Sequence, residues 1–505
     1  MSDASVRNAL RSHSRLVVVE APGGCGKTHQ AAEYANDVAS SSIARLLVLT
    51  HTHAACSVFT NRTRHVGARV EVRTIDSLIA QIAGAYHAGL RLPADVADWV
   101  RREGRDGHAR LASNVAKLVE RHPMIAASLA QRYPIVICDE HQDCSGDQHA
   151  ICMAIAEQGA RLRIFGDPMQ RIFKDGRPSD ATPLDWNQLS RQADEVEELD
   201  HPHRWNSGCP DLGRWSLQAR EALRAGGKVD LRVARPSSVS VVRADNSAPR
   251  YGDYRVAGAD RRPIDAFERS HDSLMILTRV PDVAKNLRAF FDRRIPLWEG
   301  HVRRALDDLV QTILVAGPDP KQLAIGVVTF MNAIGRGFTT SGFGKRLIRE
   351  VAEGCVRRVS GKPAALQSIA RLILDSPDHV GVAAALRQLN ELRRTSSQFA
   401  QIRIDCQVEL REAMRLGRSE DLDQAVAAIT HDRTYSRPKP PRKSISTIYK
   451  AKGLESDAVM VVHCDAQTFP DKAEARCLLY VALSRAKKAL LLVVPNADPS
   501  PLLIV

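Results

Sequence analysis

The chain has 505 residues, enough for three or four domains at roughly 150 residues each. Apolar residues make up 44% of it and charged residues 26%, as in a soluble globular protein, and no uncharged apolar run approaches the roughly 18 residues of a membrane span. The net charge of +13 favours polyanions, such as nucleic acid, over acidic partners. Ten sparse cysteines without a C-x-x-C pair argue against a disulfide framework or a zinc ribbon. Together with an N-terminal apolar run too short for a signal peptide, they indicate a cytoplasmic protein without a membrane partner.

The order of predicted elements indicates an α/β fold. Short apolar runs at 15–20 and 46–50 flank a helix-forming stretch at 31–39, an alternation typical of a parallel sheet. Residues 85–132 have helical spacing and predict a small insertion, while 301–439 predict a mostly helical region without a confident strand. Further strands are predicted at 135–138, 162–165, 240–242, 274–278, 459–462 and 490–494.

A glycine-rich segment between the first predicted strand and helix carries the strongest local signal. It has the context of a P-loop, although its first position is Ala rather than Gly. Glycines let backbone N–H groups surround the β- and γ-phosphates of a nucleotide, a lysine adds a point charge, and a hydroxyl ligates Mg²⁺. The segment consists of Ala21, Pro22, Gly23, Gly24, Cys25, Gly26, Lys27 and Thr28.

A pair of carboxylates follows the predicted strand at 135–138. Ligands of open α/β sheets bind at the carboxyl ends of strands, which is where Asp139 and Glu140 stand. Asp139 is expected to hold Mg²⁺ through water, and Glu140 to orient or deprotonate an attacking water. With the P-loop, this pair predicts hydrolysis of a nucleoside triphosphate.

Eight ordered blocks between residues 20 and 486 resemble the motifs of the UvrD/Rep/PcrA group of superfamily 1 DNA helicases. The blocks are EAPGGCGKT at 20–28, THTHAA at 50–55, RTIDSL at 73–78, DEHQD at 139–143, GDPMQRIF at 166–173, the segment 199–206 with Arg204, TIYKAKGLE at 447–455 and YVALSRA at 480–486.

The resemblance implies two RecA-like P-loop domains with parallel sheets, plus helical insertions, with ATP in the cleft between the domains. The first RecA-like domain would comprise 1–84 and 133–198, and the second 199–300 and 440–505. Residues 85–132 and 301–439 would be compact versions of the two insertions of the family.

The resemblance also assigns roles to residues of the cleft. The first lobe would supply Lys27, Thr28, Asp139, Glu140 and Gln170. Arg204 and Arg485 would reach the phosphates from the second lobe as arginine fingers, so that hydrolysis is coupled to closure of the lobes. Gly453 and Glu455 would complete the ATP site, with Glu455 accepting a hydrogen bond from the ribose.

DNA is expected to lie across the tops of both lobes. Phe173 is the best candidate for stacking on a base, whereas core packing is the better interpretation of Trp186 and Trp205. Other candidate DNA-binding residues are Thr50, His51, Thr74, Thr447 and Tyr449. The spacing of His51, His53 and Cys56 could also suit a metal, but their place in the THTHAA block favours a DNA-facing loop.

Departures from the family pattern leave some properties open. No Gln precedes the P-loop, although the family reads adenine with one there, so other nucleotides are alternatives to ATP. Tyr449 and Asp76 each stand where the family usually has His.

The leading hypothesis is an ATP-dependent helicase and translocase, stimulated by single-stranded DNA, that uses Mg²⁺ and moves 3′-to-5′ on single-stranded or 3′-tailed DNA in repair or anti-phage defence. The compact insertions also resemble the helicase-like subunit of Gabija-type systems, which works beside an OLD-family nuclease. The alternative is therefore a subunit that senses nucleotide or DNA ends and regulates a partner nuclease without processive unwinding.

Overall fold

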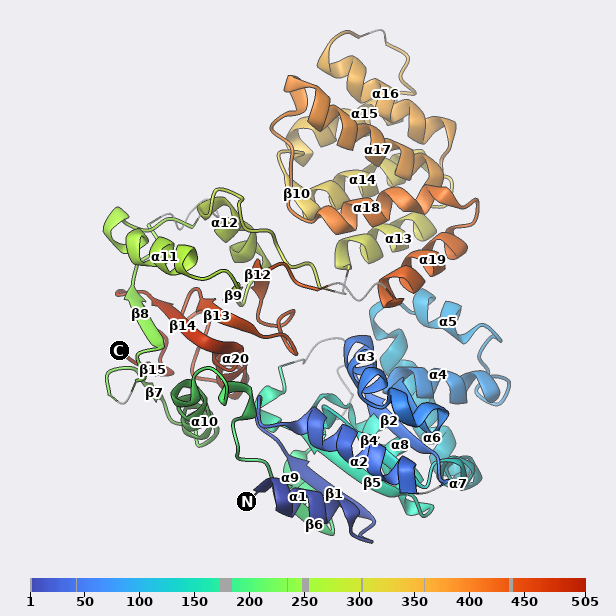
Figure 1. Ribbon diagram of the computed structural model, residues 1–505. Helices are drawn as coiled ribbons and strands as arrows, with labels where there is room; N and C mark the ends of the chain where they lie inside the picture. Colours follow the sequence, from blue (N-terminus) through green and yellow to red (C-terminus); the bar gives the residue numbers. More distant parts are fainter. Residues whose placement is uncertain are drawn as a thin grey trace. The chain divides into compact units, whose positions relative to one another are not determined.

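The computed structural model describes residues 2–41, 43–172, 184–233, 235–247, 254–300, 303–357, 359–435 and 439–505 (Figure 1). The chain divides into two compact units. Unit 1 comprises Met1–Ala248, Arg255–Val280 and Ala451–Val505, and unit 2 comprises Pro249–Tyr254 and Pro281–Lys450. The finer division into four domains stays a prediction. Within the described ranges, every helix is too short or too polar to span a bilayer.

The first sheet of unit 1 is built from strands that are all parallel to their neighbours. These are β1 (Leu16–Glu20), β2 (Leu46–Thr50), β3 (Val70–Thr74), β4 (Ile135–Cys138), β5 (Arg161–Gly166) and β6 (Glu195–Glu198), in the order β3-β2-β4-β5-β1-β6. The four strands predicted within this region are confirmed. The edge strands β3 and β6 were not predicted, because their sequences VEVRT and EVEE lack the continuous apolar run of a strand that is buried on both faces.

Helices cover both faces of this sheet. Successive residues of β1 enter different cores: Leu16 and Val18 pack into one, and Val17 and Val19 into the other. The insertion predicted as helical at 85–132 is indeed helical, with α5, α6 and α7. The helices of this part are α1 (Ser2–Arg11), α2 (Lys27–Ser41), α3 (His53–Arg62), α4 (Ile75–Ala85), α5 (Val96–Arg102), α6 (Gly107–Arg121), α7 (Pro123–Arg132), α8 (Gly146–Glu157) and α9 (Trp186–Gln192).

Unit 1 contains a second parallel sheet. Its strands are β9 (Leu274–Thr278), β13 (Ser456–Val461), β14 (Ala486–Val494) and β8 (Val239–Arg243), in that order. The two-residue strands β7 (Val229–Asp230) and β15 (Leu503–Ile504) pair separately. The helices are α10 (Pro210–Arg224), α11 (Gly258–Ser270) and α20 (Ala473–Leu483). Two parallel sheets with helical layers confirm the α/β, RecA-like architecture.

Unit 2 is mostly helical, and Figure 1 draws most of its helices in yellow to orange. The helices are α12 (Pro281–Phe290), α13 (Arg304–Ala316), α14 (Pro320–Ile334), α15 (Lys345–Ala352), α16 (Lys362–Asp375), α17 (His379–Thr395), α18 (Gln407–Arg415) and α19 (Leu422–Tyr435). Helices α13 to α19 enclose an apolar core of their own. The antiparallel pair β10 (Gly335–Arg336) and β11 (Arg403–Ile404) was not predicted, since two residues carry no alternating pattern. Strand β12 (Lys443–Thr447) completes the unit.

Candidate functional site

The carboxyl ends of the first sheet's parallel strands gather most of the sequence blocks at one edge. Thr50 at the end of β2 lies opposite Thr74 at the end of β3, and Glu20 at the end of β1 lies opposite Gly166 at the end of β5. Strand β4 ends between them at Cys138. This edge is where open α/β sheets bind their ligands.

The glycine-rich turn at this edge has a backbone that needs glycine. Gly24 and Gly26 have φ angles of +91° and +86°, which side chains rarely tolerate. A Cβ on Gly24 would lie 2.6 Å from the Trp205 ring, so the close approach also excludes a side chain. Helix α2 starts directly afterwards at Lys27. A glycine-rich turn that leads directly into a helix N-terminus is the arrangement that binds phosphate.

Lys27 faces two carboxylates below this turn. Its ammonium forms an ion pair with Glu140 and lies 3.7 Å from Oδ1 of Asp139. Burial raises the pKa of Asp139 to about 6. Burial also acts upward on Glu140, but the charges of Lys27 and Lys452 outweigh it and hold the pKa of Glu140 far below its usual value. Glu140 is therefore ionised at neutral pH.

The donor set fits a nucleotide with a divalent cation. Oδ1 of Asp139 is buried without a hydrogen-bond partner, and Thr28 lies half-buried in the first turn of α2. Hard cations such as Mg²⁺ prefer oxygen ligands of these kinds. The backbone of Glu140 is itself unusual, with φ 55° and ψ 36° in the left-handed region.

Side-chain amides connect the acidic pair to the loop after β5. Gln142 donates to Oε2 of Glu140 at 2.5 Å and accepts from the backbone N–H of Asp167 at 3.0 Å. Gln170, in a short helix at Pro168–Gln170, donates to Oδ2 of Asp167 at 2.9 Å. One continuous hydrogen-bonded path thus joins the DEHQD and GDPMQRIF blocks.

Residues from the C-terminal YVALSRA block reach the same place. The hydroxyl of Tyr480 accepts a hydrogen bond from the N–H of Gly23 at 2.8 Å. Arg485 is buried and donates to Oε1 of Gln170 at 3.3 Å, and a Cβ on Gly23 would lie 3.3 Å from its guanidinium. Burial, and then the nearby Arg204, lower the pKa of Arg485 to about 10, so it remains charged at neutral pH.

Arg204 approaches the turn from another direction. The backbone N–H of Arg204 donates to the carbonyl of Gly24 at 3.0 Å, and its guanidinium forms an ion pair with Glu455 at 2.7 Å. Glu455 is half exposed, and Gly453 before it has a positive φ of 80°. All the residues predicted to handle the nucleotide thus lie in unit 1.

The structure adds polar residues that were not predicted. Lys452 pairs with Asp143, and its place inside the TIYKAKGLE block could have identified it. Arg220 of α10 is fully buried and pairs with Asp167 at 3.0 Å and with Glu20. No motif surrounds Arg220, so only the fold reveals its contacts.

The candidate DNA residues of unit 1 have local partners. The hydroxyl of Thr50 donates to the carbonyl of Thr52 at 3.1 Å, and Thr74 caps α4 by accepting from the N–H of Ser77 at 3.1 Å. Nε2 of His51 lies 3.2 Å from Sγ of Cys144.

The remaining candidates lie elsewhere. Thr447 and Tyr449 belong to unit 2, and Phe173 lies outside the described residues. Trp186 and Trp205 are both buried, which confirms core packing as their role.

Two family models match the chain. The UvrD/REP helicase N-terminal domain matches residues 93–175, and the UvrD-like helicase C-terminal domain matches 444–493. No curated protein matches the sequence. The first match contains Asp139, Glu140 and Gln170, and the second contains Lys452 and Arg485. Both matched segments thus contribute to one site, and the two matches support a UvrD/Rep-like helicase, that is, a DNA helicase that hydrolyses ATP.

Proposed function

We propose that this protein is a single-stranded-DNA-stimulated ATPase that translocates 3′-to-5′ and unwinds DNA in repair or anti-phage defence. The polarity rests on the resemblance to the UvrD/Rep/PcrA group. The positive net charge of +13 supports a polyanionic track.

The proposed nucleotide site uses the groups at the edge of the first sheet. The backbone of 21–28 and the Lys27 ammonium would hold the β- and γ-phosphates, while Thr28 and Asp139 would hold Mg²⁺. Bound Mg²⁺ would neutralise charge on the phosphates. Once Lys27 turns to a phosphate, the ionised carboxylate of Glu140 is released to orient the attacking water and accept its proton.

The position of Arg485 is the observation that most supports this proposal. Its guanidinium lies beside Gly23 and is bonded to Gln170, a residue 315 positions earlier in the chain. A charge there would stabilise the transferred phosphoryl group, as would Arg204. Arginine fingers contribute about 10³–10⁵ in rate.

Arg204 must exchange partners to act in this way. In the free protein it pairs with Glu455, which we assign to the ribose with Gly453. Binding of the sugar to Glu455 would release Arg204 toward the phosphates, and hydrolysis would then depend on a correctly seated nucleotide. Because no glutamine precedes the P-loop, we expect other nucleoside triphosphates to be accepted beside ATP.

DNA contacts are proposed for Thr50, His51 and Thr74 at the sheet edge, and for Phe173, Thr447 and Tyr449. Threonine hydroxyls contact phosphates and set register without reading sequence, and an aromatic ring stacks on any base. Single-stranded or 3′-tailed DNA is therefore the expected track.

Strand displacement tests the proposal. We expect ATP-dependent unwinding of a duplex with a 3′ tail but not of one with a 5′ tail, and faster ATP hydrolysis when single-stranded DNA is added. Lys27→Ala should abolish hydrolysis while largely sparing DNA binding. Near-normal ATPase activity in Lys27→Ala would refute the nucleotide site, and unwinding from the 5′ tail alone would refute the polarity.

The compact insertion formed by α5, α6 and α7 favours a second candidate. A motor with little accessory structure suits a subunit that senses nucleotide or DNA ends and controls a partner nuclease. ATP hydrolysis stimulated by single strands without any displacement would favour this function. Co-purification with a nuclease encoded by a neighbouring gene would then identify the partner.

A further inference from the structure

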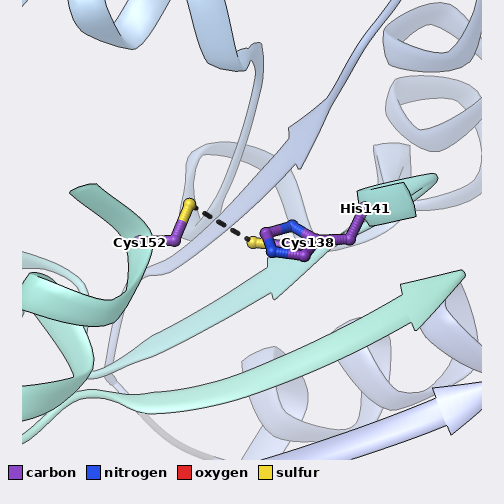
Figure 2. Close-up of side chains that lie close together, drawn as sticks. All are labelled: Cys138, His141 and Cys152. Carbon is purple, nitrogen blue, oxygen red and sulfur yellow. Dashed lines mark hydrogen bonds between the residues drawn. The ribbon is translucent and has the colours of Figure 1, made fainter. Parts of the chain in front are cut away.

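Three side chains of types that can ligate a metal meet inside unit 1, next to the acidic pair but turned into the core. They are Cys138 at the end of β4, His141 in the short helix His141–Asp143, and Cys152 in α8 (Figure 2). One potential ligand atom from each lies within 4.8 Å of the other two, and all three residues are buried. Neither the nucleotide chemistry nor the predicted DNA contacts use them.

The spacing of the two sulfurs suits a tetrahedral cation. The Sγ atoms of Cys138 and Cys152 lie 3.8 Å apart. Zinc–sulfur bonds of about 2.3 Å at a tetrahedral angle place two sulfurs about 3.8 Å apart, whereas a disulfide needs about 2.05 Å. Apolar packing alone would explain the two thiols, whereas the polar imidazole of His141 buried beside them needs hydrogen-bond or metal partners.

The surroundings of His141 provide the second layer that metal sites usually have. Its Nε2 lies 3.0 Å from Nδ1 of His149, and its Nδ1 lies 3.3 Å from Sγ of Cys144. A metal-ligating imidazole commonly bonds a polar partner through its other nitrogen, which fixes the ring. His149 would serve in that way on one side, and the thiol of Cys144 lies beside the other ring nitrogen.

Zinc binding would release the protons of the cysteine thiols, because the thiolate is the ligand. A small recess lined in part by His51, Cys138, His141 and Cys144 borders the cluster.

We propose that Cys138, His141 and Cys152, with Cys144 as the fourth ligand, bind one zinc ion. Thiolates and imidazole select zinc, whereas the oxygen atoms of Asp139 and Thr28 select Mg²⁺, so the two sites do not compete. The zinc would fasten the end of β4 to α8 directly behind the DEHQD block. It would thereby stiffen the backbone that presents Asp139 and Glu140 to the nucleotide.

The ligands also follow a compact pattern in the sequence, C-x₂-H-x₂-C-x₄-H-x₂-C over residues 138–152. A histidine stands between the first two cysteines, so a search for C-x-x-C pairs does not find this pattern.

Metal analysis of the full-length protein tests the proposal. Protein purified under reducing conditions, without chelator or metal-affinity resin, should contain one zinc ion per chain by elemental mass spectrometry. Cobalt(II) added to the zinc-free reduced protein should give the sulfur-to-cobalt charge-transfer band and the visible bands of a tetrahedral site with two or more thiolates.

Matched variants localise the ion. Cys152→Ala should lose the zinc, while Cys464→Ala, which removes another fully buried thiol of unit 1, should retain it. Zinc retained in Cys152→Ala would overturn the proposal. If Cys152→Ala does not fold, the cobalt spectrum of the unaltered protein decides: absence of the charge-transfer band overturns the site. A Cys138–Cys152 disulfide in metal-free protein, found by peptide mass spectrometry, would overturn it as well.

Discussion

Replacing Arg220 with methionine should strongly destabilise unit 1. The Arg220 guanidinium is fully buried and forms ion pairs with Asp167, at 3.0 Å, and with Glu20, both of which are themselves buried. Methionine keeps most of the side-chain volume, so little cavity forms and the loss is mainly electrostatic. Removing one partner of a buried pair and leaving the other charged costs about 3–5 kcal/mol.

Arg224→Met is the matched control. Arg224 lies one helical turn further along α10 and pairs with the same Glu20 at 2.8 Å, but its side chain is 43% exposed. Exposed pairs contribute about 0–1 kcal/mol, and salt weakens them. Urea unfolding followed by tryptophan fluorescence reports mainly on unit 1, because every tryptophan except Trp298 lies there. Equal losses of stability in the two variants would refute the assignment of the cost to burial.

Three further predictions concern the site itself. Asp139→Asn should raise the melting temperature of the free protein above pH 6, because a folded-state pKa of about 6 against the usual 3.8 means that the ionised group opposes folding there. This increase in melting temperature should become smaller as the pH falls toward 3.8. Mg²⁺-dependent hydrolysis should be lost at every pH. A variant that is less stable than the unaltered protein at neutral pH would contradict this reasoning. Gly24→Ala should cost more stability than Gly159→Ala, because both have a positive φ but only the first would push a Cβ into Trp205; equal melting temperatures would dismiss that contact. Phe173→Ala should reduce stimulation by single-stranded DNA more than basal hydrolysis, and equal reductions would count against stacking.

The sequence was informative where one local pattern determines the structure. The apolar runs of β1, β2 and β4 predicted buried parallel strands, and the glycines between β1 and α2 predicted a phosphate-binding turn that the positive φ angles of Gly24 and Gly26 match. These features depend on residues that are neighbours in the chain, so composition and spacing suffice to find them.

Features that depend on distant residues could not be predicted. The bond between the Tyr480 hydroxyl and the Gly23 N–H joins residues 457 positions apart, and Arg220 meets Asp167 only because α10 packs beside the first sheet. The buried contact between Cys138 and Cys152 likewise requires α8 to lie against β4. Patterns among residues that are neighbours in the chain do not predict such packing.

The left-handed backbone of Glu140 has a consequence for substitution at this position. The left-handed conformation costs a residue with a side chain roughly 1–2 kcal/mol, whereas glycine adopts it without this penalty. Glycine at position 140 would relieve this strain, but it would also remove the carboxylate that pairs with the buried ammonium of Lys27. Breaking a buried pair costs about 3–5 kcal/mol, which exceeds the strain that glycine would remove. Stability and chemistry therefore both favour glutamate here, and the strained backbone persists because the ion pair outweighs it.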